Sequence, residues 1–165
     1  MSNRLRVVNT APLIFLAKLG RLELLHLEAD FVYVPPKVLE EIRVVTDEAA
    51  QAVEQALLEG QLVERGCTRT DLLAFAGQSL DPGEAEVIAL ALEINTKDIV
   101  LDDLDARRFA RRSGLEPIGT LGLLLVAKQK GILEAIGPEI EALREVGLRV
   151  SEALVMRVLA EAGEE

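Results

Sequence analysis

The sequence is poor in the residues that build disulfides, zinc sites and aromatic cores. Its 165 residues include one cysteine, Cys67, one histidine, His26, and no tryptophan. A lone cysteine forms no disulfide within the chain, and these two residues provide no zinc-ligand pair at motif spacing. Aromatic residues make up only 3% of a chain that is 50% hydrophobic, so Leu, Val, Ile and Ala must form the core. This composition favours helices packed on a sheet.

Long apolar runs, internal repeats and low-complexity segments are also missing. The strongest apolar run, Leu121 to Ala127, is far shorter than the roughly 18 residues that span a bilayer, and we interpret it as part of a buried helix. The segment Met1 to Val8 lacks the charged-then-apolar layout of a signal peptide. We therefore expect a cytoplasmic protein with no membrane partner, and a single domain spanning residues 1–165.

Positive charge is scarce, because 18 Lys and Arg face 28 Asp and Glu, which gives a formal net charge of −10. Such an excess opposes non-specific binding of nucleic acid, which depends on cations that neutralise phosphates. A divalent metal held among carboxylates would reverse the local sign, and a basic patch is compatible with an acidic total. The charge therefore weakens the case for a nucleic-acid enzyme without excluding one.

Strand-like and helix-like segments alternate along the chain. The strand candidates are short runs that contain β-formers or lie between helical patterns: Leu5 to Val8, Phe31 to Val34, Leu62 to Glu64, Ile99 to Leu101 and Glu116 to Ile118. Helical spacing or strong helix formers mark the segments Pro12 to Leu19, Leu22 to Leu25, Pro36 to Arg43, Glu48 to Glu59, Pro82 to Ile94, Ala106 to Ser113, Leu121 to Lys130, Pro138 to Glu145 and Ser151 to Ala162. This order predicts an α/β protein, a three-layer α/β/α sandwich with a mostly parallel twisted sheet of about five strands. Helices from about residue 138 onward pack on it or extend it.

Asn9 and Thr10 follow the first predicted strand directly and precede a helical segment with Pro12 in its first turn. Taken alone, this segment is typical of a helix cap, which Asn or Thr commonly provides. In a parallel sheet, however, binding residues gather at the carboxyl ends of strands. Asn9 and the pair Asp102-Asp103 lie at two such strand ends.

Two further carboxylates lie near the start of the helix predicted over Pro82 to Ile94. Asp81 and Glu84 have the spacing of a capping box, so capping alone explains Glu84. Glu84 also lies on a largely apolar helix face, which would direct its carboxylate toward the sheet, where it needs a partner. Glu86 projects to another side, and we expect it to be solvated or to support the site as a neighbour.

Asp102, Asp103 and Asp105 form the most informative cluster, because three acids follow directly on a buried strand. Like charges this close repel and can raise one another's pKa. A turn or a helix cap needs only one acid, and simple surface exposure would account for Asp105. A divalent cation accounts for the cluster more economically, since Mg²⁺ and Mn²⁺ prefer oxygen ligands.

Four arginines follow these acids at helical i, i+1, i+4 and i+5 spacing: Arg107, Arg108, Arg111 and Arg112. They could form a solvated face that pairs with nearby carboxylates. They could instead contact the phosphates of RNA beside a metal site, because guanidinium groups suit phosphate. The sequence leaves both interpretations open.

These acidic positions, in their order and setting, resemble those of the PIN-domain family, and more closely a prokaryotic branch related to VapC-type ribonuclease toxins. The resemblance covers roughly Leu5 to Ser151. The motifs that carry it are Val8-Asn9-Thr10-Ala11-Pro12-Leu13-Ile14, Pro82-Gly83-Glu84-Ala85-Glu86, Leu101-Asp102-Asp103 with Arg107-Arg108, and Ile118-Gly119-Thr120-Leu121-Gly122. Each motif alone is weak, but the ordered set is fairly specific.

The resemblance implies a site that binds Mg²⁺ or Mn²⁺ and hydrolyses phosphodiester bonds, usually in RNA. It assigns Glu84 and Asp103 to the metal, together with the position of Asn9. Asp102 and Asp105 are nearby candidates for binding the metal through water or for positioning a nucleophilic water. The family has an aspartate where this chain has Asn9, and an amide oxygen brings neither a charge nor a base.

The resemblance also implies supporting residues and partners. Thr10 and Thr120 would orient ligands by hydrogen bonds, and an antitoxin protein and a second copy of the chain in a homodimer are expected. We therefore weigh a metal-dependent endoribonuclease, the toxin of a toxin-antitoxin pair attenuated by Asn9, against a catalytically silent module that binds nucleic acid or protein. A hydrolase of small phosphate esters is a third hypothesis.

Overall fold

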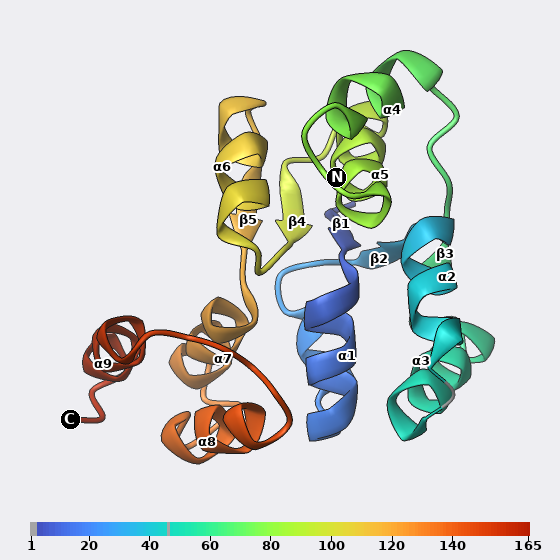
Figure 1. Ribbon diagram of the computed structural model, residues 1–165. Helices are drawn as coiled ribbons and strands as arrows, with labels where there is room; N and C mark the ends of the chain where they lie inside the picture. The colour runs from blue at the N-terminus through green and yellow to red at the C-terminus, as the bar shows by residue number, and fades with distance from the viewer. Residues whose placement is uncertain (1–2, 46) are drawn as a thin grey trace.

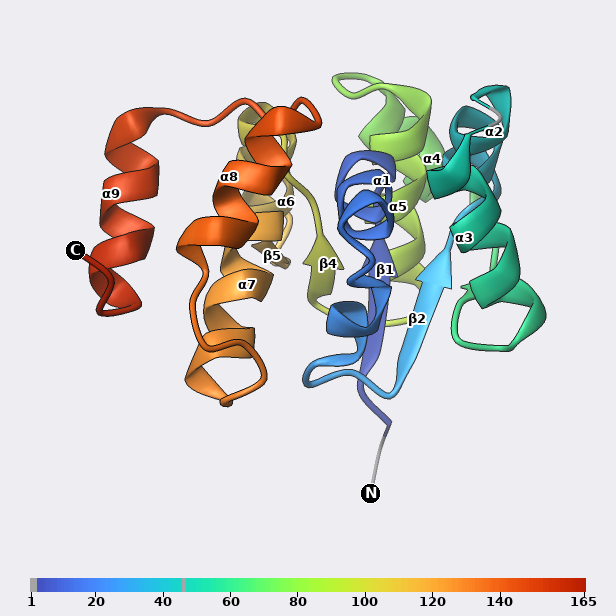
Figure 2. The ribbon, with the colours of Figure 1, turned by 90° about the horizontal axis from the view of Figure 1, so that it is seen from below.

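A computed structural model describes residues 3–45 and 47–165 of the chain. Within these residues, five parallel strands form a sheet in the order β3-β2-β1-β4-β5. The strands are β1 (Leu5–Val8), β2 (Phe31–Val34), β3 (Val63–Glu64), β4 (Asp98–Val100) and β5 (Glu116–Ile118). Figure 2 shows the arrowheads of β1, β2 and β4 pointing the same way, so the carboxyl ends of these strands share one edge. The predicted parallel sheet is confirmed.

Helices cover both faces of this sheet. They are α1 (Thr10–Leu19), the 3-10 helix η1 (Leu22–His26), α2 (Pro36–Val44), α3 (Glu48–Leu58), α4 (Thr70–Gly77), α5 (Pro82–Glu93), α6 (Leu104–Arg112), α7 (Thr120–Gln129), α8 (Gly137–Glu145) and α9 (Glu152–Glu161). In Figure 1, α4, α5 and α6 lie on one side of the sheet and α1, α7 and α8 on the other, while α9 packs on the outside of α7. The predicted α/β/α sandwich is confirmed.

Aliphatic side chains fill the space between the layers, as the scarcity of aromatics requires. Val7 and Val8 of β1 and Ile99 and Val100 of β4 have no exposed surface, because helices cover both faces of the central strands. Helix α5 is buried on most of its circumference, from Ala85 to Ala91. The largest fully buried side chains are all Leu or Ile, so the composition identified the core correctly.

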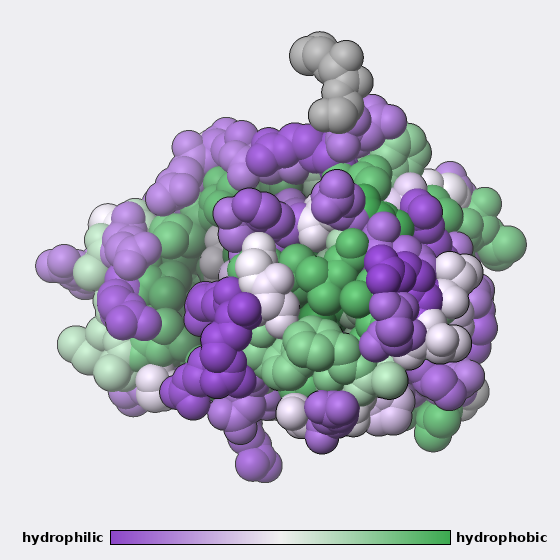
Figure 3. Space-filling model, turned by 90° about the horizontal axis from the view of Figure 1, so that it is seen from above, coloured by the Kyte–Doolittle hydropathy of each residue, from purple (hydrophilic) through white to green (hydrophobic). Residues whose placement is uncertain are grey.

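Helix α4 is the element that the sequence patterns did not predict. Only Ala76 of its residues is buried, and Arg69 at its N-cap makes no side-chain capping bond, so it has neither a strong apolar stripe nor a start signal. It packs along α5, and Phe75 lies 5.3 Å from Phe109 of α6 between ring centroids. Figure 3 looks onto this side of the molecule and shows apolar surface between polar ridges.

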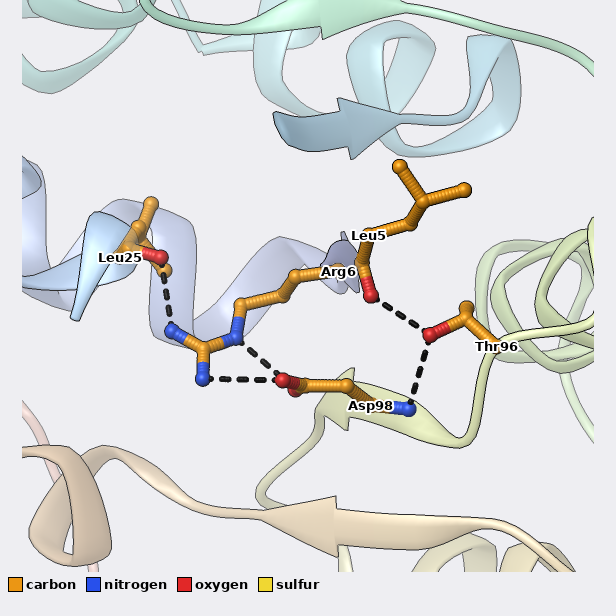
Figure 4. A network of polar contacts seen from close by, with 5 residues as sticks. All are labelled: Leu5, Arg6, Leu25, Thr96 and Asp98. Carbon is orange, nitrogen blue, oxygen red and sulfur yellow. Dashed lines mark hydrogen bonds and ion pairs between the residues drawn. The ribbon is translucent and has the colours of Figure 1, made fainter. Parts of the chain in front are cut away.

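A polar network fixes β1 against β4 near the amino ends of the strands (Figure 4). Arg6 is only 4% exposed, and its guanidinium donates to both carboxylate oxygens of Asp98, at 2.9 and 3.1 Å, and to the carbonyl oxygen of Leu25 at 2.7 Å. Thr96 donates to the carbonyl oxygen of Leu5 at 2.6 Å. The network sets the register that brings Asn9 and the acids after β4 to the opposite edge.

None of the helices within residues 3–45 and 47–165 combines the length and the hydropathy that crossing a membrane requires.

Candidate functional site

The ends of β1 and β4 place Asn9 beside the acidic cluster. The backbone N–H of Asn9 donates to the carbonyl oxygen of Val100 at 3.0 Å, and Val8 is in register with Val100. The two chain segments therefore leave the sheet side by side, with Asn9 on one and Asp102-Asp103 on the other. This is the carboxyl edge at which the sequence predicted a site.

The side chain of Asn9 does not cap the helix that follows it. Asn9 occupies the N-cap position of α1, as the capping interpretation predicted, but its side chain makes no capping hydrogen bond. The residue is only 7% exposed, and its Oδ1 is buried without a partner among the described residues. A buried acceptor without a partner is costly and uncommon, and a bound ion is one arrangement that would satisfy Oδ1.

Thr10 and Gly83 hold a carboxylate that the sequence analysis missed, that of Glu41 in α2. The hydroxyl of Thr10 donates to Glu41 Oε2 at 2.6 Å. Glycine at position 83 leaves room for this carboxylate, because a Cβ built there would collide with Glu41 Oε1 and displace the end of that side chain. Glu41 lies on the same helix face as the buried Val38 and Ile42, and this spacing is the signal that could have revealed an acid directed toward the site.

Glu84 both caps its helix and faces the site. Its backbone N–H donates to Asp81 Oδ1 at 2.9 Å and its Oε1 accepts from the backbone N–H of Asp81 at 3.4 Å, so the predicted capping box is confirmed. Burial, followed by the negative charges of Asp81 and Asp103, raises the pKa of Glu84 to about 7. Asp103 is therefore near enough for its charge to act on Glu84, although its own Oδ2 caps α6 through the N–H of Ala106 at 2.9 Å.

Asp102 is held firmly by the residue that begins α7. Its two carboxylate oxygens accept from the backbone N–H and from the hydroxyl of Thr120, both at 2.7 Å. Burial raises the pKa of Asp102, while these hydrogen bonds and the charge of Arg107 oppose the rise. A Cβ on Gly119 would lie 2.9 Å from Asp102 Oδ1 and 3.0 Å from Arg107 Nη1, so glycine permits this close arrangement. Burial lowers the pKa of Arg107, and the nearby charge of Arg111 lowers it further.

Two of the predicted residues lie in other surroundings. Glu86 is only 7% exposed and accepts from the backbone N–H groups of Lys37 at 3.0 Å and Cys67 at 3.3 Å. The expectation that Glu86 is solvated is therefore wrong, and its carboxylate joins the start of α2 to the segment before α4. Asp105 is exposed and pairs with Arg108 at 3.3 Å, as the surface interpretation predicted.

Four oxygen-bearing side chains are candidates for a site near the end of β1. They are Asn9 Oδ1 and the carboxylates of Glu41, Glu84 and Asp103. In the part of the chain that the structure describes, no three Asp, Glu, His or Cys side chains stand ready to enclose a metal ion. Glu41, Glu84 and Asp103 each accept a hydrogen bond within the protein, from Thr10, Asp81 and Ala106 respectively. The donor chemistry nevertheless suits a hard cation, which would relieve the repulsion felt by Glu84 and satisfy the buried amide oxygen.

A family model described as a PIN domain matches residues 5–164 of the chain. A search of curated proteins finds no match. The matched range contains the whole sheet and all four candidate residues near the end of β1.

Proposed function

This chain belongs to the PIN domain family, a nuclease fold, and on that premise we propose that it is a metal-dependent endoribonuclease. The observation that carries the proposal is Asn9 Oδ1, which is buried without a partner among the described residues and lies at the strand edge from which Asp102 and Asp103 also leave the sheet. A structural cap would use this oxygen, whereas a cation ligand would leave it free until the ion binds.

Asn9, Glu41, Glu84 and Asp103 would hold Mg²⁺ or Mn²⁺. When bound, such an ion lowers the pKa of a water ligand and stabilises charge that develops on a phosphate. The four protein groups contribute three carboxylates and one neutral amide, which is one charge fewer than the same set would have with the family's aspartate at position 9. We therefore expect this site to bind the metal ion less tightly than a site made only of carboxylates would.

Other side chains position these groups and the substrate. Thr10 fixes one oxygen of Glu41, and Thr120 fixes both oxygens of Asp102. With its oxygens engaged in this way, Asp102 would position a water rather than bind the ion directly. Asp105 is exposed and pairs with Arg108, so the proposal gives it no direct part in binding the ion or in catalysis. Glu86 would support the site through the start of α2.

RNA is the proposed substrate, with the arginines of α6 contacting its phosphates: Arg107, Arg108, Arg111 and Arg112. The family resemblance extends the proposal to a toxin that acts in the cytoplasm, is inhibited by an antitoxin protein and forms a homodimer. These biological assignments rest on the resemblance, and the chemistry rests on the site.

The central experiment compares two aspartates on either side of Leu104. The purified protein, freed of any bound partner, is incubated with single-stranded RNA and Mn²⁺. Asp103→Asn keeps an oxygen that can cap α6 but removes the charge, and we expect it to abolish cleavage. Asp105→Asn removes the same charge from an exposed position and should change the rate less than about threefold. Cleavage that survives Asp103→Asn would contradict the proposal.

Restoring aspartate at position 9 tests the effect of the amide. Asn9→Asp adds an anionic ligand, so we expect tighter Mn²⁺ binding by calorimetry and faster RNA cleavage, by about tenfold or more. Without metal, the same change adds a buried negative charge at the edge that already carries Asp102 and Asp103, and it should lower the melting temperature. An Asn9→Asp protein that binds Mn²⁺ no more tightly than the wild type would show that position 9 is not a ligand.

Asn9 also supports a second candidate function, a catalytically silent module that keeps the fold for binding. A neutral residue at this position and a net charge of −10 both reduce the expected nuclease activity. Metal calorimetry run beside the cleavage assay distinguishes the two candidates. RNA binding without metal uptake or turnover supports the silent module, and metal-dependent hydrolysis by the wild type excludes it.

A further inference from the structure

A groove of about 390 Å³ opens next to Asp102, between α7, α9 and the start of α6. Its walls combine apolar side chains with three arginines, Arg107, Arg149 and Arg157. Asp102 and Gly119 line its inner end, so the groove is continuous with the carboxyl edge of the sheet. Leu104, which follows Asp103 directly, also lines the groove and remains 62% exposed.

The arginines of this groove are without ion-pair partners across the described residues, although the chain has an excess of acids. Among the side chains that line the groove, the acidic ones are Asp102 and Glu161. Asp102 is already engaged by Thr120 through both oxygens. The groove therefore presents positive charge that complements an anion.

Helix α9, which carries Arg157, is fixed in place by the end of the chain. Glu164 accepts from Lys128 Nζ at 2.7 Å and from the backbone N–H groups of Ile136 at 2.8 Å and Gly137 at 3.0 Å. These bonds lower the pKa of Glu164 to about 2, so it stays ionised at neutral pH. The wall of the groove is therefore held by α7 and by the start of α8.

From this geometry we infer that the groove binds a nucleotide of single-stranded RNA next to the cleaved phosphodiester bond. The base lies against the apolar wall, and Arg149 and Arg157 contact the adjoining phosphates. The size of the groove suits a small ligand group, apolar walls accept the face of any base, and guanidinium groups suit phosphate. This inference deepens the proposed function and depends on it for the substrate.

The first test measures RNA binding without cleavage. Fluorescence anisotropy with a short labelled single-stranded RNA, in Ca²⁺ or EDTA, compares the wild type with the double variant Arg149→Ala/Arg157→Ala. We expect Kd to rise roughly tenfold and the slope of log affinity against log salt to become shallower by about 1.4, since each lost phosphate contact on a single strand removes about 0.7.

Arg4→Ala/Lys97→Ala is the matched control, because it removes the same charge at the amino ends of the strands, where both residues are exposed. Its Kd should rise less than about twofold. Equal weakening by the two double variants would show a general charge effect and overturn the inference. If the wild type cleaves RNA but Arg149→Ala/Arg157→Ala binds RNA with an unchanged Kd, the inference that the groove binds RNA is overturned. The nuclease proposal would remain intact in that case.

The second test addresses the base. An oligomer with one abasic ribose is compared with intact RNA at each position around the cleavage site, and one position should show a loss of binding of about fivefold or more. Leu104→Ala shortens an exposed side chain and should reduce that difference without unfolding the protein. If the abasic ribose weakens binding equally at every position, or at none, the proposed base site is overturned. Stronger competition by polyglutamate than by RNA would also overturn it and would assign the groove to an acidic protein partner.

Discussion

Asn9 reduces the electrostatic strain of the site in the absence of metal. Glu84 already has a pKa of about 7 because burial and two nearby acids oppose its ionisation. An aspartate at position 9 would add a further negative charge to the same edge, and without a cation the folded state would be less stable. The amide keeps an oxygen ligand at the end of β1 while it avoids that cost.

Glu84 should make stability depend on pH. Its folded-state pKa of about 7 is above the ordinary value of 4.5, so its ionisation disfavours the folded state as pH rises from about 4.5 through 7. In Glu84→Gln the side chain still accepts from the backbone of Asp81 but carries no charge. We therefore expect this variant to melt at a higher temperature than the wild type at pH 8 in EDTA, and at the same temperature at pH 4.5. Asp105→Asn serves as the control and should show no such trend.

Gly119 is the residue at which the smallest addition should disturb the site most. The Cβ of alanine would lie 2.9 Å from Asp102 Oδ1, so Asp102 must move away from Thr120. We expect Gly119→Ala to lower the free energy of unfolding by about 1.5–3 kcal/mol and to slow RNA cleavage at least tenfold. Gly77→Ala is the control, because a Cβ there meets no neighbour within 4 Å, and it should be neutral or slightly stabilising.

At the scale of elements, the position of the site depends on how β1 meets β4. Arg6 and Asp98 pair across these strands, and Arg6 also binds the end of η1 through the carbonyl oxygen of Leu25. A slip of one residue between the strands would turn every side chain of one strand to the opposite face. The network thus holds Asn9 and Asp103 together from the far edge of the sheet.

Breaking this pair should weaken the fold more than breaking a surface pair. Arg6 is almost fully buried, so Asp98→Asn leaves a buried guanidinium without its counter-charge. We expect the free energy of unfolding, measured in urea, to fall by about 2–4 kcal/mol. Glu40→Gln breaks the exposed Lys37–Glu40 pair and should cost less than about 1 kcal/mol. Similar losses in the two variants would show that the Arg6–Asp98 pair has no special structural role.

At the scale of the whole molecule, the charges are distributed unevenly. The chain carries a formal charge of −10, yet the arginines of α6 and of the groove concentrate positive charge beside the site. A negatively charged surface elsewhere repels nucleic acid from the remaining faces. This distribution favours a strand that enters along α6 and the groove over one that wraps the protein.

Salt dependence measures how many phosphates the protein contacts. If binding uses only the arginines of α6 and the groove, the slope of log affinity against log salt should be no steeper than about −4 for single-stranded RNA. The measurement is a titration of the wild type by anisotropy in KCl from about 50 to about 300 mM, a range over which screening of exposed charges increases strongly. A steeper slope would mean that other surfaces contribute to binding.

The sequence by itself determined the elements, with the exception of α4, and the edge of the sheet at which the candidate site lies. The bounds of β1 and β2 agree with the prediction, because short buried runs end at Asn9 and Pro35, and the capping signals of Asp81 and Ser151 act within one helical turn. Strands that alternate with helices required a parallel sheet, and a parallel sheet required Asn9 and Asp103 to share an edge. Capping signals and strand runs depend on residues close in the sequence, and the parallel arrangement follows from the order of strands and helices. Both can therefore be inferred from a single sequence.

Tertiary structure alone decided which side chains meet at that edge. Glu41 joins the site through Thr10, 31 residues away, and Glu86 is buried because α2 and the segment at Cys67 donate to it. The pairing of Asp102 with Thr120 and the groove that includes Arg157 likewise depend on how helices cross the sheet. Helical and strand periodicity show which face of an element is buried, but the neighbour across that face is set only when the layers pack.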